Sequence, residues 1–131
     1  MDATTYVPVG NNTEVALLRF LQDADVPVHH LIQRKLKRIR ATSPFSSEKK
    51  YSAVALECPD KQGKIAIYLK GAPEVVLDQC HQTLSSTGLN QLTDPERKNI
   101  TDKVNTMAGQ PLRVMAFAYV EMDAQEWSAQ V

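Results

Sequence analysis

Two apolar segments near the centre of the chain, residues 51–58 and 64–69, restrict its fold more than any other feature. Both are rich in Val, Ile, Leu and Tyr, which favour extended strands. Only five residues, 59–63, separate them, and their sequence Pro-Asp-Lys-Gln-Gly is typical of a turn. Strands joined by so short a connection pair side by side in opposite directions. The sequence therefore predicts a β-hairpin in the middle of the chain.

Helical patterns precede this hairpin. Thr13 is a suitable N-cap for a helix that carries apolar residues up to Leu21. That helix should end at 23–25, because a proline follows. A short second helix is predicted over 27–35. Residues 36–42 alternate less cleanly between apolar and polar side chains and are compatible with a strand.

The second half of the chain also mixes helix and strand signals. Pro73 is well placed as the first residue of a helix directly after the hairpin. Residues 85–90 are polar and predict a loop. The clearest helix begins with the capping box Thr-Asp-Pro-Glu at 93–96 and ends at Gly109. The last apolar run, 112–122, predicts a well-buried strand.

Strands that lie this close together in the sequence, mixed with helices, favour the α+β class. We therefore expect an antiparallel β-sheet flanked by helices. The chain has 131 residues, which at roughly 150 residues per domain predicts a single domain over 1–131. A domain of this size buries enough surface for an ordinary hydrophobic core.

The charge balance argues against a nucleic-acid binder. The 15 Lys and Arg equal the 15 Asp and Glu, so the formal charge is 15 − 15 = 0, whereas proteins that bind phosphate backbones usually carry a basic surplus. A surplus exists only between His29 and Arg40, where five basic residues and no acid occur. These are Arg34, Lys35, Lys37, Arg38 and Arg40. A solvated helix face or strand edge is favoured there over a nucleic-acid patch.

No membrane segment or secretory signal is predicted. The longest apolar run, 114–120, is far shorter than the roughly 18 residues that a spanning helix needs. The N-terminal sequence Met-Asp-Ala-Thr-Thr has neither the basic start nor the apolar core of a signal peptide.

Neither a metal site nor a catalytic set is predicted. Cys58 and Cys80 form no Cys-x-x-Cys pair, and both are interpreted as small buried or half-buried side chains. The three histidines lack the partners that a zinc site or a Ser-His-Asp triad would need. The sequence contains no Gly-x-Ser-x-Gly elbow, no phosphate loop and no Gly-x-Gly-x-x-Gly motif.

Four short segments combine polar or charged residues with tight backbone: 10–14, 44–50, 70–74 and 112–113. Taken singly, each has an ordinary structural explanation. The first is compatible with a helix cap, the second with a loop and the third with a strand-to-helix turn. The fourth is compatible with an arginine that reaches the surface from a strand.

Taken together and in this order, the segments resemble the nucleotide-binding domain of P-type ATPases, cation pumps that phosphorylate themselves on an aspartate. The matching strings are Gly-x-x-Thr-Glu followed by Ala-Leu, Pro-Phe-Ser-Ser-x-x-Lys, Lys-Gly-Ala-Pro-Glu, and Leu-Arg before an apolar strand. They span residues 10–119. The set is similar to type II pumps that move calcium or sodium and potassium, and most similar to calcium pumps of the plasma-membrane type.

The resemblance implies an ATP site. Phe45 is the candidate stacking platform for adenine, and its alternative role is that of a core phenylalanine. Glu14 can accept a hydrogen bond from the adenine amino group, and it also suits the first turn of a helix.

The same resemblance implies that basic residues hold the phosphates. Lys50 and Lys70 would bring positive charge, and Arg113 would reach the phosphates as a forked donor. Gly71 would let the backbone approach the nucleotide. Ser47 stands where calcium pumps of the reticulum type carry an arginine, so a second basic contact is not expected there.

The resemblance further implies what the chain would do and what it lacks. The phosphorylation motif Asp-Lys-Thr-Gly-Thr is absent, and so are transmembrane spans. We therefore expect a soluble fragment of a larger pump, with no catalytic residue and no turnover of its own. It would hold ATP, with Mg²⁺ in the parent, for transfer to an aspartate on a separate domain. Its partners would be the phosphorylation and actuator domains of the same chain, at the cytosolic face of a membrane. It would contact neither the membrane nor nucleic acid.

Calcium is the expected cargo of the pump. Three alternatives stay open at this point: a sodium/potassium-type pump domain, a nucleic-acid or acidic-protein binder that uses residues 29–40, and an interaction domain without a ligand.

Overall fold

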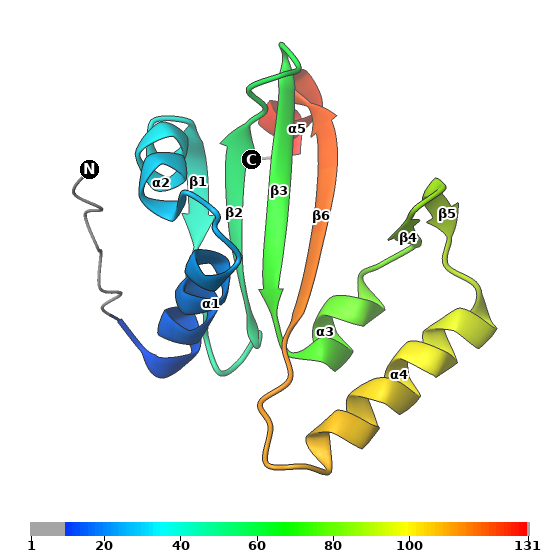
Figure 1. Cartoon of the computed structure of the whole chain (residues 1–131). Helices are drawn as coiled ribbons and strands as arrows, with labels where there is room; N and C mark the ends of the chain where they lie inside the picture. The colour runs from blue at the N-terminus through cyan, green and yellow to red at the C-terminus, as the bar shows by residue number, and fades with distance from the viewer. Residues whose placement is uncertain (1–9, 131) are drawn as a thin grey trace. The chain divides into compact units, whose positions relative to one another are not determined.

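The computed structural model describes residues 10–130. The chain forms two compact units, residues 1–38 and 39–131. That residues 1–131 form a single nucleotide-binding domain stays a prediction. The elements in chain order are α1 (Asn12–Asp23), α2 (Val28–Leu36), β1 (Ile39–Ser43), β2 (Tyr51–Glu57), β3 (Lys64–Gly71), α3 (Pro73–Asp78), β4 (Gln82–Ser85), β5 (Gly88–Gln91), α4 (Asp94–Ala108), β6 (Ala116–Asp123) and α5 (Ala124–Gln130) (Figure 1).

The described part of the first unit contains the two predicted helices, α1 and α2, which contact each other. Its N-cap differs from the prediction. Asn11, not Thr13, caps α1, because its side-chain oxygen accepts a hydrogen bond from the Glu14 amide at 2.9 Å. Thr13 lies inside the first turn. Helix α1 ends at Asp23, and Asp25 adopts a positive φ of 58° in the turn before α2.

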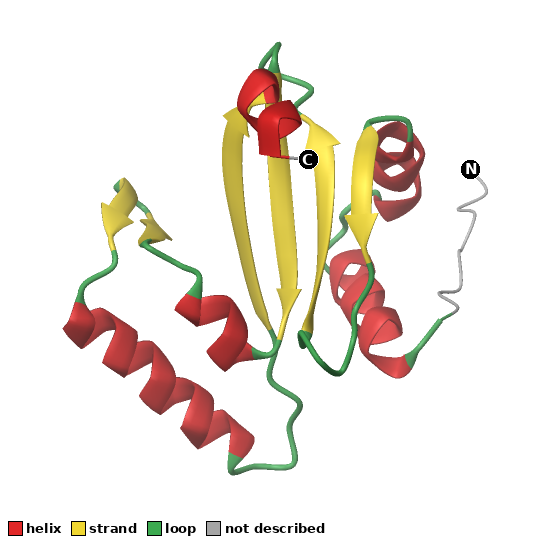
Figure 2. Ribbon diagram, turned by 180° about the vertical axis from the view of Figure 1, so that it is seen from behind, coloured by secondary structure: helices red, strands yellow, loops and turns green. Residues whose placement is uncertain are grey.

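The second unit contains the predicted antiparallel sheet, so the α+β class is confirmed. Its strand order is β1-β2-β3-β6, and each neighbouring pair is antiparallel (Figure 2). The central pair β2 and β3 is the hairpin predicted from the sequence, with Tyr51 opposite Gly71 at one end and Glu57 opposite Ile65 at the other. Of residues 36–42, which were considered compatible with a strand, 39–42 lie in β1, whereas Leu36 is the last residue of α2.

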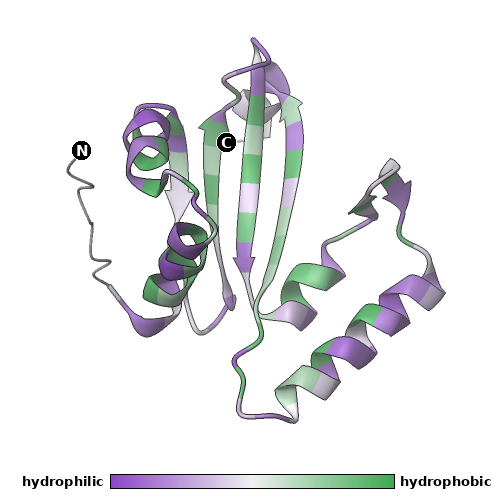
Figure 3. Cartoon of the chain, viewed as in Figure 1, coloured by the Kyte–Doolittle hydropathy of each residue, from purple (hydrophilic) through white to green (hydrophobic). Residues whose placement is uncertain are grey.

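The core of this unit lies on the sheet and beneath α3. Ile65 and Ala66 are adjacent on β3, so they face opposite sides of the sheet, and both are buried. Pro73, the first residue of α3 as predicted, and Val76 are buried as well. Helix α3 contacts β3 and β6, and α5 contacts the same two strands near the other end of the sheet (Figure 2). Figure 3 shows hydrophobic residues gathered in the strands and in α3.

The prediction of a loop at 85–90 was wrong. Residues 82–85 and 88–91 form a small hairpin, β4 and β5, in which Ser85 pairs with Gly88. Gly88 has a φ of +104°, and the polar side chains of the turn bond to one another, with Asn90 Nδ2 2.8 Å from Ser85 Oγ. This hairpin is therefore stabilised by a glycine and by side-chain hydrogen bonds in its turn, and its sequence lacks the apolar alternation that usually indicates a pair of strands.

The prediction that the last strand is well buried was also wrong. Strand β6 lies at the edge of the sheet and pairs with β3 alone. None of its residues is fully buried, and the side chains of Phe117, Tyr119 and Val120 are exposed. The apolar run predicts a strand correctly, but its position at the edge depends on the pairing of segments that are distant in the sequence.

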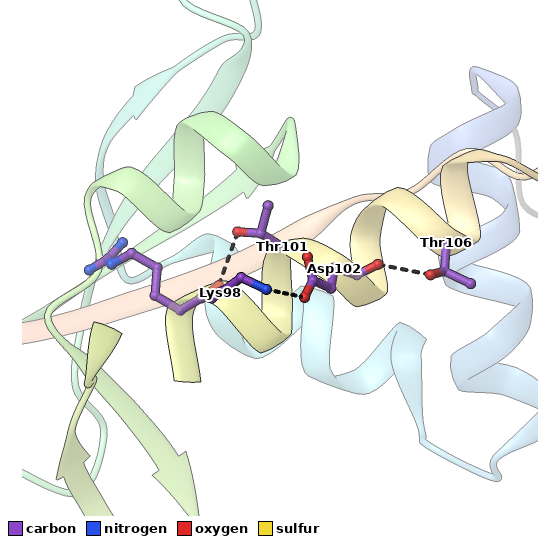
Figure 4. A network of polar contacts seen from close by, with 5 residues as sticks. Lys98, Thr101, Asp102 and Thr106 are labelled. Carbon is purple, nitrogen blue, oxygen red and sulfur yellow. Dashed lines mark hydrogen bonds and ion pairs between the residues drawn. The ribbon is translucent and has the colours of Figure 1, made fainter. Parts of the chain in front are cut away.

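Helix α4 carries the capping box predicted at Thr93 and ends at Ala108. The guanidinium group of Arg97 in this helix donates hydrogen bonds to the carbonyl oxygens of Leu77 and Cys80, both at 2.6 Å. These bonds hold α4 against the end of α3. On the exposed surface of the helix, Lys98 Nζ lies 3.2 Å from the Asp102 carboxylate (Figure 4). Along the same helix the Thr106 hydroxyl donates to the Asp102 carbonyl oxygen at 2.9 Å.

The capping box makes stability depend on pH. The amide and hydroxyl of Thr93 each donate to the Glu96 carboxylate at 2.9 Å, and these bonds lower the pKa of that carboxyl. A carboxyl whose pKa is lowered by folding stabilises the folded state above its unfolded pKa of about 4.3, and loses this effect as the pH falls through its folded pKa. Glu96→Gln should therefore lower the free energy of unfolding at pH 7, and the difference from wild type should shrink towards pH 3. Urea unfolding at both pH values measures this. A difference that does not change with pH, or one equally seen for the control Asp94→Asn, contradicts it.

Candidate functional site

The loop that carries Phe45 joins β1 to β2 and is tightly hydrogen-bonded. The Lys50 amide donates to the Ser46 carbonyl oxygen at 2.7 Å, and the Lys49 amide donates to the Ser46 hydroxyl at 3.2 Å. Lys49 extends back over the loop, where its ammonium group bonds to Ser43 and lies 5.3 Å from the centre of the Tyr51 ring. Phe45 is 62% exposed, so it is not a core phenylalanine.

Gly71 brings the end of β3 against this loop. A Cβ atom on Gly71 would lie 2.4 Å from the Lys50 carbonyl oxygen and 2.6 Å from the Tyr51 Cα. The next amide, that of Ala72, donates to the same Lys50 oxygen at 3.0 Å. Only glycine leaves room for this contact. Gly71 therefore holds Lys50 at the end of β3, next to Lys70, and its direct approach to a nucleotide stays a prediction.

Lys70 lies one residue earlier on β3, half-buried between two neighbouring strands. It pairs with Ser52 of β2 on one side and with Phe117 of β6 on the other. The Ser52 hydroxyl contacts the Lys70 carbonyl oxygen at 3.4 Å. Residues paired directly across antiparallel strands project from the same face, so these three side chains share one face of the sheet.

A cavity of about 520 Å³ lies on these strands, a size typical of sites for small molecules. It is lined by Ser52, Ala53, Val54, Tyr68, Leu69, Lys70, Phe117, Ala118 and Tyr119. Among these described residues, only Lys70 is charged at neutral pH. The cavity is otherwise a largely apolar surface with one cation at its end.

An aromatic pair forms part of the cavity floor. Tyr68 pairs with Tyr119 across β3 and β6, and their rings stack with centres 6.1 Å apart and planes inclined by 29°. Burial raises the pKa of the Tyr68 phenol above its usual value, so the phenol is neutral at physiological pH. With Phe117, the floor thus presents three aromatic rings. These rings were not among the predicted site residues, although the alternation Ala-Phe-Ala-Tyr at 116–119 indicates large side chains on one face.

Arg113 belongs to the same end of the sheet. It is exposed and lies three residues before Ala116, the β6 residue that pairs with Gly71. Gly71 in turn pairs with Tyr51, which follows Lys50. The structure therefore brings five of the six predicted site residues to one end of the sheet in the second unit. They are Phe45, Lys50, Lys70, Gly71 and Arg113.

Glu14 lies in the other unit. It is exposed in the first turn of α1, and its backbone amide bonds to Asn11. An acidic residue in this position suits the partial positive charge of a helix N-terminus, which is its expected structural role. Its contact with adenine stays a prediction.

The basic segment does not form a single element. Arg34 and Lys35 lie in the last turn of α2, where basic residues suit the helix dipole. Lys37 and Arg38 follow the helix and are exposed. Arg40 lies on β1 and forms an ion pair with Glu57 of β2.

Two further findings concern residues 10–130 only. Within this range, no group of three or more His, Cys, Asp or Glu side chains is arranged to hold a metal ion. Within the same range, no helix has the length and apolar character needed to cross a membrane. Cys58 and Cys80 are free and half-buried, as predicted.

Comparison with known proteins gives one consistent result. The family model described as "P-type ATPase, cytoplasmic domain N" matches residues 2–131. The chain is 35% identical over 118 residues to calcium-transporting ATPase 1, plasma membrane-type, of Oryza sativa subsp. japonica, a match that covers 88% of this chain. It is 35% identical over 123 residues, 93% of the chain, to the sodium/potassium exporting P-type ATPase cta3 of Schizosaccharomyces pombe. It is also 31% identical over 118 residues, 88% of the chain, to the putative calcium-transporting ATPase 11, plasma membrane-type, of Arabidopsis thaliana. In each case the match spans 11% of the relative's length.

Proposed function

The chain belongs to the family of P-type ATPase cytoplasmic N domains, and from that premise we propose that it binds ATP on the sheet face that bears Lys70. One observation carries the proposal. Lys70 is the only charged residue on the apolar cavity of about 520 Å³ formed by β2, β3 and β6. A nucleotide combines a flat aromatic base with anionic phosphates, and a cavity with an aromatic floor and one cation complements both.

Lys50 and Arg113 would add to the positive charge at this end of the sheet. The close contact of Gly71 with the Lys50 carbonyl keeps the Phe45 loop beside the end of β3. Base and phosphate contacts would therefore come from neighbouring segments of the second unit, and the predicted contact of Glu14 with adenine stays a prediction.

The domain would position ATP and leave the chemistry to another part of the pump. Phosphoryl transfer depends mainly on placement and on electrostatic stabilisation of the phosphates. We propose that the nucleotide is presented to an aspartate on a separate phosphorylation domain at the cytosolic side of a membrane, and that the actuator domain acts in the same cycle. Mg²⁺ would arrive on the ATP phosphates, because Mg²⁺ in ATP-using proteins is bound largely through the substrate phosphates and its own waters.

The proposed cargo of the whole pump is calcium. Two of the relatives described above are named as calcium-transporting, and the third is named as a sodium/potassium exporter. A sodium/potassium-type pump is therefore the alternative. The proposed nucleotide site would serve both, because ATP and not the cation contacts it.

Calorimetric titration of the chain with ATP tests the proposal. We expect weak binding with a dissociation constant on the order of 1 mM, which corresponds to roughly −4 kcal/mol. Increasing salt should weaken it, because the phosphates bind to cations. Absence of binding at roughly 10 mM ATP would contradict the proposal. Tight, salt-dependent binding of an oligonucleotide that is lost on neutralising Arg34, Lys35 and Lys37 would favour the nucleic-acid alternative instead.

A further inference from the structure

We propose that Lys49 is a positioning residue for the nucleotide, because its ammonium group joins the two ends of the Phe45 loop, residues 44–50, and holds that loop in one conformation. The inference rests on the proposed function, since it takes the loop to lie at an ATP site. Lys49 is not one of the predicted site residues, and the role assigned to it is carried out through its neighbours.

The exposure of Phe45 makes its position dependent on the loop. Its side chain belongs to a residue that is 62% exposed, and the residues on both sides of it, Pro44 and Ser46, are exposed as well. A side chain this open is held mainly by the backbone that carries it, because it has little packing in a core. A ligand that contacts such a ring loses affinity when the loop has to be ordered on binding. The loop therefore needs stabilising contacts of its own.

The side chain of Lys49 supplies contacts at both ends of the loop. Ser43 is the last residue of β1, and Tyr51 is the first residue of β2. The Lys49 ammonium group donates a hydrogen bond to the Ser43 hydroxyl and lies 5.3 Å from the centre of the Tyr51 ring, within the range of a cation–π interaction. All three residues are half-buried, so solvent weakens these contacts less than it would at a fully exposed site. One side chain thus bridges the start and the end of the loop.

The backbone at the end of the loop adopts a conformation that needs such support. Lys50 has a φ of +63°, in the left-handed region that residues other than glycine rarely adopt. A conformation of this kind persists where several surrounding contacts fix it. Here the Lys49 amide donates to the Ser46 hydroxyl at 3.2 Å, and the Lys50 amide donates to the Ser46 carbonyl oxygen at 2.7 Å. Lys49 therefore stabilises the turn through its backbone as well as its side chain.

The two neighbouring lysines differ in their surroundings. Lys50 is exposed, whereas Lys49 is half-buried and its ammonium group contacts Ser43 and Tyr51. A direct bond from Lys49 to a phosphate would have to replace those contacts. Lys49 therefore acts through the loop, and direct contact with phosphate is the role expected of Lys50.

NMR on the full chain, with and without ATP, tests the role of Lys49. Lys49→Met keeps most of the length of the side chain and removes its charge. In the absence of ATP it should lower the heteronuclear NOE of residues 45–48, because the loop gains fast motion. It should weaken ATP binding by about three- to tenfold, the fold-change that corresponds to ordering one more side chain on binding. Lys49→Arg keeps a donor and a positive charge and should restore both the loop order and the ATP affinity.

Two further variants separate positioning from charge. Ser43→Ala removes one partner of the Lys49 ammonium group without changing any charge, so it should also loosen residues 45–48 and weaken ATP binding. Lys98→Met removes one positive charge from α4, where the exposed Lys98 side chain pairs with Asp102. It should leave both the loop motion and the ATP affinity close to those of wild type.

The outcomes distinguish the role of Lys49 from the function on which it rests. If Lys49→Met weakens ATP binding while the loop stays ordered and Ser43→Ala binds ATP normally, Lys49 contacts the phosphates directly and the inference is wrong. If the loop becomes mobile and ATP affinity does not change, the inference is also wrong, and the proposed function stands. If wild type does not bind ATP, the proposed function itself fails and the inference fails with it. Ser43→Ala decides the question by the same two readouts if Lys49→Met does not fold.

Discussion

Replacing Lys70 with glutamine is expected to weaken ATP binding by roughly 10- to 100-fold. A hydrogen bond to a charged group contributes about 1.5–3 kcal/mol, and about 1.4 kcal/mol corresponds to a tenfold change in affinity. Lys70 is the only charged side chain among the residues that line the cavity, so no other lining residue replaces its interaction with the phosphates. Glutamine keeps most of the length of the side chain and removes the charge. The dissociation constant from calorimetry or NMR titration is the measurement.

Lys64→Gln is the matched control for this prediction. Lys64 lies six residues from Lys70, at the opposite end of β3, and its side chain projects from the same face of the sheet. Its ammonium group is 2.7 Å from the Asp123 carboxylate, and both side chains are exposed. Such pairs contribute little to stability, so this variant should fold and bind ATP as wild type does. Equal losses in both variants would mean that general positive charge, rather than a site at Lys70, attracts ATP.

Replacing Gly71 with alanine is expected to lower the free energy of unfolding by about 3 kcal/mol or more. The new Cβ would lie 2.4 Å from the Lys50 carbonyl oxygen, a contact with backbone that only a shift of β2 or β3 can relieve. Such a shift would also weaken the hydrogen bond from the Ala72 amide to the same oxygen. A loss of this size is a large fraction of the stability of a typical domain. Urea unfolding at neutral pH measures it.

Gly109→Ala is the control for Gly71→Ala. Gly109 has a φ of −70°, which alanine adopts without strain, and an added Cβ would make ordinary contacts of 3.5 Å. This variant should be as stable as wild type or slightly more stable. If Gly71→Ala unfolds at the same urea concentration as Gly109→Ala, the close packing between Gly71 and the Lys50 loop is not important for the fold.

Local patterns in the sequence predicted most of the secondary structure correctly. The hairpin of β2 and β3, the proline that opens α3 and the capping box at Thr93 are confirmed, because each depends on residues that are close in the sequence. The β4–β5 hairpin was missed because polar side-chain bonds and Gly88 stabilise its turn. The exposure of β6 was missed because strand order depends on contacts between distant segments.

The candidate site was predicted in part. The register of β2 and β3 pairs Tyr51 with Gly71, which brings Lys50 close to Lys70 and Gly71. The short turn of the hairpin sets that register. The contact between a Gly71 Cβ and the Lys50 oxygen could not be derived from the sequence, because it depends on the path of the loop. Phe117 and Tyr119 were read as part of a uniform apolar run. Their alternation with small alanines was the signal that placed both on one face.

The central claim, that this chain binds ATP on the Lys70 face of its sheet, is tested most directly by mapping amide shifts with ATP. We expect amide shifts that grow with millimolar ATP and that gather at Lys50, Lys70, Gly71 and Phe117. Residues around Lys64 and in the β4–β5 hairpin should remain unchanged. Shifts confined to residues 34–40, or no shifts at millimolar ATP, would contradict it.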